Sequence, residues 1–597
     1  MVGACGEPLP GDEINVTRSA LDGRLTDDLE QKSIILTALP IVENVGRTAD
    51  PCLPLTKLAG AASKKWTMGY LLTQASSSSP TPTTASNFVK RWMSTWTEPL
   101  DGKVHMDGKL YPKVNGEIVE PNAEPGNKST GQILNEAWQT NSGSKTTYKM
   151  DYAPFRLLAI VPRFDLRKRR RNGEGLAGEL RFVFGAVDNN KAHGCSTIGE
   201  NTVILEYAVD RATENDVVAW AKSWLALANE TLGSTTYLNK LDGLVQGVIQ
   251  AGKGSGYKGR DEQPRPNGSE LIRIRTNEKR GSMFAWHLRE WEIVSDSRYN
   301  PNPATVKQTP SRVYKTPQDS TVGNWANDNA YEILHDTYTV PTTTTPKLGG
   351  KDVNATEGDE PSGVWDVGFD DNEVRHAFAM NTCEGCHHTE TDNIALHIET
   401  RDPGKDSLLS SFLTGVFEDG RPFSVQDTRG TKRYFHEAAD RAADLRNLAS
   451  GYYTVPLPEG IPSTALATYF KLVNNNSKCL DMGGSSAGVL AQQWSCGGGG
   501  NQRFTAISLG GGYYTIRVKQ GNYCLQAEAN NTVTQRACSS YVDQVATITS
   551  VLGLPYYEIK FFSTNKCLEL PDSNNGTKAR QSTCDTGTGR QMFSFVE

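Results

Sequence analysis

Long apolar runs are missing from this sequence. It holds no stretch of roughly 18 or more apolar residues, so no transmembrane helix is expected. Its first residues also lack the hydrophobic core of a secretory signal, as is expected of a mature or truncated chain. Charge of one sign is equally scarce, because the net charge of the 597 residues is only −6. That balance implies neither nucleic acid nor an anionic membrane surface as a partner.

Signatures of several enzyme classes are absent as well. No His-Glu-x-x-His occurs, and no Gly-x-Ser-x-Gly nucleophile elbow, with its strand before and helix after the serine, is expected. Residues 254–259 match Gly-x-Gly-x-x-Gly, but they follow a helical pattern and precede prolines, so they predict a loop. Glu290 and Glu292 fall on one face of an expected strand, where a glycosidase could use two carboxylates, but we expect both to be solvated. Whether the chain is an enzyme stays open.

The chain does contain enough apolar material for several cores. At 597 residues, of which 37% are hydrophobic, it predicts roughly two to four domains. We expect a loop-rich segment at residues 1–60, an α+β body at 61–450, a linker at 451–464 and a β-rich domain at 465–597. The alternation and spacing of apolar residues predict these elements of the body: strands at 155–161, 179–187, 203–209, 271–275 and 283–293, and helices at 217–232, 237–250, 325–335 and 371–382.

One pattern is written three times near the carboxyl end. Each copy opens on a cysteine followed by leucine, contains a second cysteine, and closes on a Gln-x-hydrophobic element, and the copies recur about every 44 residues. The cysteines pair by copy as Cys479 with Cys496, Cys524 with Cys538, and Cys567 with Cys584. Short apolar runs broken by Gly, Asn, Asp and Ser predict strands and turns in every copy. Each repeat could therefore close its own disulfide.

This repeat resembles the ricin-type β-trefoil lectin family over about residues 465–597. The resemblance implies a pseudo-threefold barrel of twelve strands with shallow sugar pockets. Carried over residue by residue, it implies a nearly complete first pocket made of Asp481, Gln492, Trp494, Asn501 and Gln502. A carboxylate can accept hydroxyl hydrogen bonds, and an indole covers the apolar face of a sugar.

The other two repeats depart from the family pattern. The second has Gln526 at the acidic position and Arg536 at the aromatic one, and the third has Glu569 and Ser582 there. We therefore expect one working sugar site, in the first repeat. The ligand would be a galactose-type or other hexose glycan, because an acid and an indole suit several hexoses alike.

The remaining cysteines bear on location. Disulfides persist in oxidising compartments, so an extracellular or cell-surface protein is expected. Val2-Gly3-Ala4-Cys5 resembles the end of a bacterial lipoprotein signal, which would make Cys5 a lipid-anchor site of a periplasmic or outer-membrane lipoprotein. Cys52 and Cys195 would then form the spare pair; the alternative is a bond between Cys5 and Cys52 or an unbonded Cys5.

A second chemical motif is Cys383-Glu384-Gly385-Cys386-His387. Cys-x-x-Cys-His is the attachment pattern of c-type haem, with His387 as one axial ligand and His397 as the nearest candidate for the other. Two alternatives stay open. Cys383 and Cys386 could form a disulfide, or these cysteines could hold zinc with the metal ligands His387 and His397.

Three function classes follow. The first is a secreted or surface-anchored carbohydrate-binding protein whose lectin domain targets glycans and whose body carries a haem-c centre. The second is a secreted glycan-directed hydrolase or toxin with a trefoil targeting module, and the third is an adhesin with structural disulfides. Segments 155–161, 178–184 and 381–383 are also similar to uncharacterised exported bacterial proteins, a resemblance that brings no known activity.

Overall fold

The structure is a computed structural model. The described residues are 25, 27–97, 104–106, 109–111, 113–114, 117–118, 128–169, 175–211, 214–251, 269–280, 285–293, 301–304, 309–310, 314, 318–330, 333, 338, 340–341, 345–346, 348, 355–356, 365–382, 385–391, 396–417, 421–449, 469–510, 513–521, 523–536, 542–551, 556–585 and 589–596.

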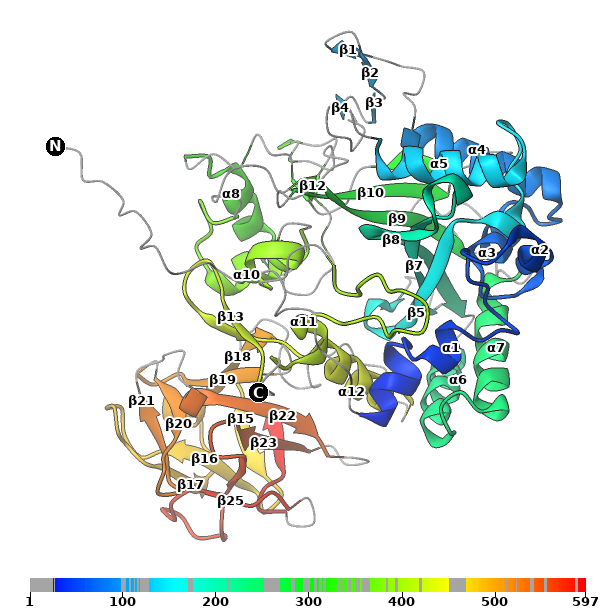
Figure 1. Ribbon diagram of the computed structural model, residues 1–597. Coiled ribbons are helices and arrows are strands. Elements are labelled where there is room, and N and C mark those ends of the chain that lie inside the picture. Colours follow the sequence, from blue (N-terminus) through cyan, green and yellow to red (C-terminus); the bar gives the residue numbers. More distant parts are fainter. Residues whose placement is uncertain are drawn as a thin grey trace, which may run out of the picture.

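The body is built on an antiparallel sheet with the strand order β11-β10-β9-β8-β7-β5 (Figure 1). The expected strands are confirmed, and most of them are longer than the apolar runs that predicted them. The strands of this path are β5 (Phe155–Arg163), β7 (Gly175–Asp188), β8 (Ser196–Arg211), β9 (Leu271–Arg280), β10 (Ala285–Ile293) and β11 (Pro301–Ala304). The two-residue strands β6 (Lys168–Arg169) and β12 (Ala355–Thr356) pair with β7 and β10.

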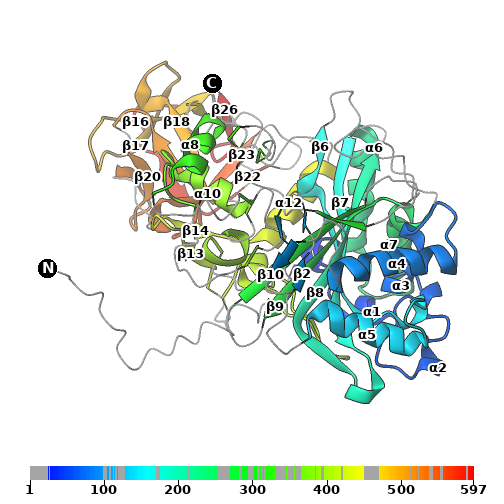
Figure 2. The same ribbon diagram turned by 90° about the horizontal axis from the view of Figure 1, so that it is seen from above.

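Helices cover one face of this sheet (Figures 1 and 2). They are α3 (Met68–Ala75), α4 (Pro82–Thr97), α5 (Thr130–Ser142) and α7 (Thr235–Ile249). The core residues Leu205, Ile274 and Trp291 are neighbours in register across three strands, and all are buried. Because side chains of a strand alternate between faces, every second residue of these strands feeds this apolar layer.

The described part of residues 1–60 belongs to the same core. It contains the short helical elements η1 (Glu30–Ile34), α1 (Leu39–Val42) and α2 (Leu55–Leu58). The Leu36 amide donates to the Ile160 carbonyl (3.0 Å), so this segment adds to the edge of the sheet at β5. It packs with the body and does not form a separate unit.

The opposite face of the sheet carries charged side chains that pair with one another. Arg181 lies 3.0 Å from Glu206. Arg273 and Arg275 lie 3.0 Å and 3.2 Å from Glu290. The expectation of a solvated Glu290 is therefore wrong, since this side chain is buried between two arginines. A buried carboxylate is stable when ion pairs replace its hydration, and the neighbouring strand supplies them here.

Two further helical elements of the body, α6 (Glu214–Leu225) and η6 (Ala226–Asn229), lie between β8 and β9 in the sequence. The elements after β11 include α8 (Thr321–Asp328), α10 (Asn372–Met380), η8 (Gly385–Thr389), α11 (Ser411–Thr414), β13 (Ser424–Gln426), β14 (Lys432–Tyr434) and α12 (Glu437–Ala449). The helix expected at 325–335 begins earlier, and its described regular part ends at Asp328. None of the described helices is both long and apolar enough to cross a bilayer.

The C-terminal domain has twelve strands in one sheet, and an α+β body followed by a β-trefoil is thus confirmed. Four strands come from each repeat: β15 (Lys471–Asn474), β16 (Lys478–Met482), β17 (Ala491–Ser495) and β18 (Phe504–Gly510); β19 (Tyr513–Val518), β20 (Cys524–Ala527), β21 (Val533–Arg536) and β22 (Val545–Ser550); β23 (Tyr557–Phe561), β24 (Lys566–Glu569), β25 (Arg580–Ser582) and β26 (Phe593–Val596). The leucines that follow the first cysteines, Leu480, Leu525 and Leu568, all lie in the shared core.

A buried glutamine ties each repeat to another. Gln493 of the first repeat donates to the Asn574 carbonyl of the third (2.8 Å). Gln535 of the second donates to the Ser486 carbonyl of the first (2.8 Å), and Gln581 of the third donates to the Thr532 carbonyl of the second (2.8 Å). All three glutamine side chains are buried, so these bonds replace lost hydration.

Candidate functional site

Asp481 is the centre of a polar cluster in the first repeat. It lies on β16, next to Cys479-Leu480, and is opposite Gln492 on β17. Its Oδ1 accepts from Gln492 Nε2 (3.0 Å), and its Oδ2 accepts from Asn501 Nδ2 (2.7 Å) and Gln502 Nε2 (2.8 Å). An ionised carboxylate has about four acceptor positions, so three amides leave room for about one further donor. The four polar residues assigned to the first pocket are therefore in contact.

Trp494, the fifth assigned residue, stands at the surface of the same strand. It follows Gln492 by two positions, so both side chains lie on one face of β17. Its side chain is 42% exposed, which is unusual for a tryptophan. An exposed indole beside a carboxylate provides a flat apolar face next to a polar group, and this combination suits one side of a pyranose ring.

The third repeat also contributes to this cluster, which the sequence did not indicate. Lys578 Nζ donates to Gln492 Oε1 (2.9 Å), and Asn575 Oδ1 accepts from Lys478 Nζ (2.8 Å). Gly576 lies against the indole, since a Cβ at that position would be 3.5 Å from Trp494 Cζ3. Reasoning within one repeat could not find these residues, because the fold brings them from almost a hundred residues away.

The equivalent positions of the other repeats differ chemically. In the second repeat, Gln544 donates to Gln526 (3.1 Å), so two neutral amides replace the acid and its donor. In the third, Glu569 accepts from Gln591 (3.1 Å) but also pairs with Arg580 (2.6 Å). Burial favours a higher pKa of Glu569, but hydrogen bonds from Ser582, Arg580 and Gln591 outweigh it and hold the pKa below its ordinary value.

The predicted cysteine pairs lie as follows. The structure bonds Cys479 to Cys496 and Cys567 to Cys584 within their repeats, and Cys52 to Cys195 in the body. Cys524 is disulfide-bonded as well, and its expected partner, Cys538, lies outside the described residues. So does Cys5, the predicted lipidation site. Because Cys52 bonds Cys195, the alternative bond between Cys5 and Cys52 is not formed.

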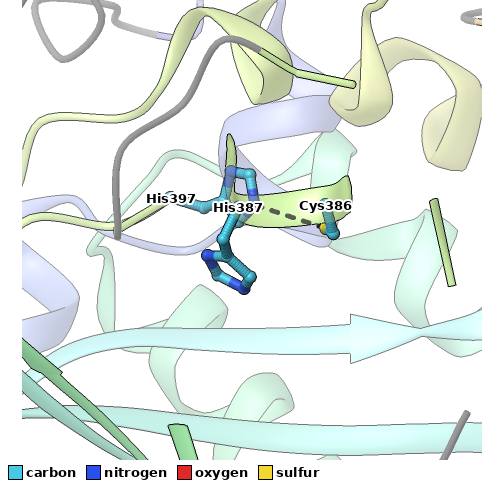
Figure 3. A group of neighbouring side chains, drawn as sticks. All are labelled: Cys386, His387 and His397. Carbon is cyan, nitrogen blue, oxygen red and sulfur yellow. Dashed lines mark hydrogen bonds between the residues drawn. The ribbon is translucent and has the colours of Figure 1, made fainter. Parts of the chain in front are cut away.

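The Cys-x-x-Cys-His motif lies just after α10. Cys386 and His387 belong to the η8 turn, and His397 comes later in the chain (Figure 3). Cys386 Sγ lies 3.6 Å from His397 Nε2, and the centroids of the two imidazole rings are 4.7 Å apart. Cys386 carries a thiol. Cys383 and Glu384 lie outside the described residues.

This geometry does not fit a haem held between His387 and His397. Two axial Fe–N bonds of about 2 Å each, on opposite faces of the macrocycle, would separate the ring centroids by about 6 Å. The observed 4.7 Å is shorter, and the rings are tilted by 47°. In addition, Cys386 Sγ lies beside His397 Nε2, whereas a thioether sulfur sits at the macrocycle edge, away from the axial ligands.

Comparison with known proteins identifies the C-terminal domain. Residues 468–593 match the family model of the ricin-type β-trefoil lectin domain, so this part of the chain is such a domain and indicates carbohydrate binding. No curated protein matches the chain.

Several solved structures are similar to part of this chain. The designed threefold-symmetric protein ThreeFoil has 27% identity and a TM-score of 0.21, with 22% of this chain and 98% of that one covered. The cytolethal distending toxin of Actinobacillus actinomycetemcomitans has 15% identity and a TM-score of 0.19, with 22% and 93% covered. A Polyporus squamosus lectin, solved with the epitope Neu5Acα2-6Galβ1-4GlcNAc, has 14% identity and a TM-score of 0.19, with 21% and 48% covered.

Proposed function

We propose that this protein is an extracellular or cell-surface carbohydrate-binding protein that holds a galactose-type or other hexose of a glycan in the first repeat of its trefoil. The observation that carries the proposal is the Asp481 cluster. A carboxylate on β16, oriented by three amide donors, lies diagonally across the strand pair from an indole on β17 that is 42% exposed. Such a site offers one oriented acceptor for a sugar hydroxyl and a flat surface for the sugar's C–H face.

The proposal assigns binding to the first repeat alone. Gln526 has no charge to offer a hydroxyl, and Glu569 is already paired with Arg580. The positions equivalent to Trp494 hold Arg536 and Ser582, which offer no aromatic face. The glycan therefore meets a single pocket per chain, and binding to one site should show no cooperativity.

The disulfides support the extracellular or cell-surface location in this proposal. Three described disulfides and the disulfide-bonded Cys524 would be reduced in a cytosolic compartment. Lipid attachment at Cys5 would place the lectin at a cell surface. In that arrangement the trefoil keeps the body next to the glycan that it has bound.

A glycan array with the full chain tests this function. The wild-type protein should bind hexose-terminated glycans, and Asp481→Asn should lose that binding, because an amide keeps the size of the side chain but offers fewer acceptors and no charge. Glu569→Gln is the matched control in the third repeat and should bind as the wild type does. Absence of wild-type binding to any hexose-terminated glycan would overturn the proposal.

A further inference from the structure

We propose that Cys386, His387 and His397 bind a single zinc ion, which fastens the η8 turn to the segment that carries His397. The ligand atoms of these three side chains all lie within 4.8 Å of one another. Figure 3 shows that the three residues come from two neighbouring stretches of backbone and meet at one place. This site is independent of the sugar pocket, which lies in another domain.

The distances agree with tetrahedral zinc. Zinc bonds of about 2.3 Å to sulfur and about 2.1 Å to nitrogen, at a tetrahedral angle, place the two ligand atoms about 3.6 Å apart. Cys386 Sγ and His397 Nε2 are 3.6 Å apart in the structure. One thiolate and two imidazoles supply three corners of a tetrahedron, and this mixture of nitrogen and sulfur ligands is typical of zinc.

A neighbouring hydroxyl orients His397 for this role. His397 Nδ1 lies 2.9 Å from Ser410 Oγ, and Ser410 is buried at the start of α11. The Ser410 amide in turn donates to the His397 carbonyl (3.0 Å). With Nδ1 engaged by the hydroxyl, Nε2 is directed toward Cys386. Metal-binding histidines commonly use their second nitrogen in this way.

Two arginines are near the proposed site. The charges of Arg441 and Arg163 act on His397. The two arginines do not oppose the ion strongly, because Arg163 pairs with Asp165 (2.6 Å) and Arg441 pairs with Glu437 (2.8 Å).

The η8 turn is held in place independently of any ion. Glu390, directly after it, accepts from Arg375 of α10 at 2.5 and 3.1 Å and lies 2.5 Å from His376 Nδ1. Gly385, at its start, packs on α10 so closely that a Cβ would lie 1.9 Å from the Ala379 carbonyl oxygen. Only glycine fits there, which explains why this residue separates Glu384 from Cys386.

A second group of possible ligands has a different role. His376, Glu390 and Asp427 are buried together, but Arg375 and Arg433 already pair with both carboxylates. The two guanidinium groups occupy the place of a cation and balance the negative charge of the two carboxylates. This network supports the turn, and the Cys386 site beside it binds the ion.

Metal analysis of the full chain, purified without a metal-binding tag or chelator, tests the proposal. We expect one zinc per chain, and we expect Cys386→Ser and His397→Ala to lose it. His193→Ala is the matched control, because His193 pairs with Asp188 at 2.9 Å and its side chain is 49% exposed. Ser410→Ala should keep the ligands but weaken zinc binding by about tenfold or more in chelator competition.

Cobalt substitution provides a measurement that does not depend on how the variants fold. Wild-type protein stripped of zinc and loaded with cobalt should show tetrahedral d–d bands and a thiolate-to-cobalt charge-transfer band. The proposal is overturned if the wild type binds no metal, if His397→Ala retains the full zinc content, if the cobalt form lacks the thiolate band, or if the protein matures with a haem absorbance.

Discussion

Removal of the Trp494 indole isolates the sugar contact from the fold. About 42% of this side chain is exposed, and a tryptophan has roughly 250 Å² of surface to bury, so about 100 Å² is available to a ligand. A hexose that covers half to all of this area removes about 50–100 Å² of apolar surface from water. At about 25 cal/mol per Å², that is about 1.3–2.5 kcal/mol. Trp494→Ala should therefore weaken binding by about 10- to 60-fold.

Because the Trp494 indole is exposed and not part of the core, Trp494→Ala should change the free energy of unfolding by no more than about 0.5 kcal/mol. Titration calorimetry with the best monosaccharide from the array measures the affinity, and thermal unfolding of the same samples measures stability. Arg536→Ala, at the equivalent position of the second repeat, is the control and should bind as the wild type does. An unchanged affinity in Trp494→Ala would refute the stacking role, as would an equal loss in Arg536→Ala.

The remaining predictions concern the body. Glu390→Gln should lower the free energy of unfolding by about 2–3 kcal/mol in denaturant titrations, because it removes the charged hydrogen bonds that Glu390 accepts from the buried Arg375 and leaves Asp427 as the ion-pair partner of this arginine. Since the pKa of Glu390 is lowered to about 2, the wild type should hold this stabilisation above about pH 4.5 and lose it as the pH falls toward 2, and the variant should not show that loss. Burial and the charge of Asp27 raise the pKa of Glu30 to about 7. The stabilisation from the protonated Glu30 is therefore fully present below about pH 4.5 and is lost as the pH rises through about 7. In Glu30→Gln, the free energy of unfolding should depend less on pH over that range. Gly385→Ala should lower both the melting temperature and the zinc content, and normal values for both would contradict the close packing on α10.

The trefoil could be predicted from its sequence because its information is local and repeated. A cysteine and leucine that recur about every 44 residues mark the same strand in each unit, and Leu480, Leu525 and Leu568 do lie in one core. The body's strands were also predictable, because apolar residues alternate along them. The ion pairs on the charged face of the sheet could not be predicted, because a strand pattern does not show that Glu290 on β10 contacts arginines of β9.

The candidate sites show the same limit. Asp481 and its amides were identified through the family resemblance, and they are in contact in the structure. Lys578 reaches Gln492 from a different repeat, and no spacing in the sequence indicates that contact. His397 was the nearest candidate by sequence distance, but the role of Ser410 depends on the position of α11, which only the folded chain defines.

The three glutamine hydrogen bonds link the repeats in a cycle: the first repeat donates to the third, the third to the second, and the second to the first. A chain with its natural ends joined and new ends opened between repeats keeps all three contacts, so a circular permutant of this domain should fold. Removal of any one repeat deletes both a glutamine that donates to a second repeat and a carbonyl that accepts from the third. One carbonyl and one buried glutamine side chain of the remaining repeats then lose these hydrogen bonds. We therefore expect the domain to tolerate circular permutation between repeats but not the removal of one repeat.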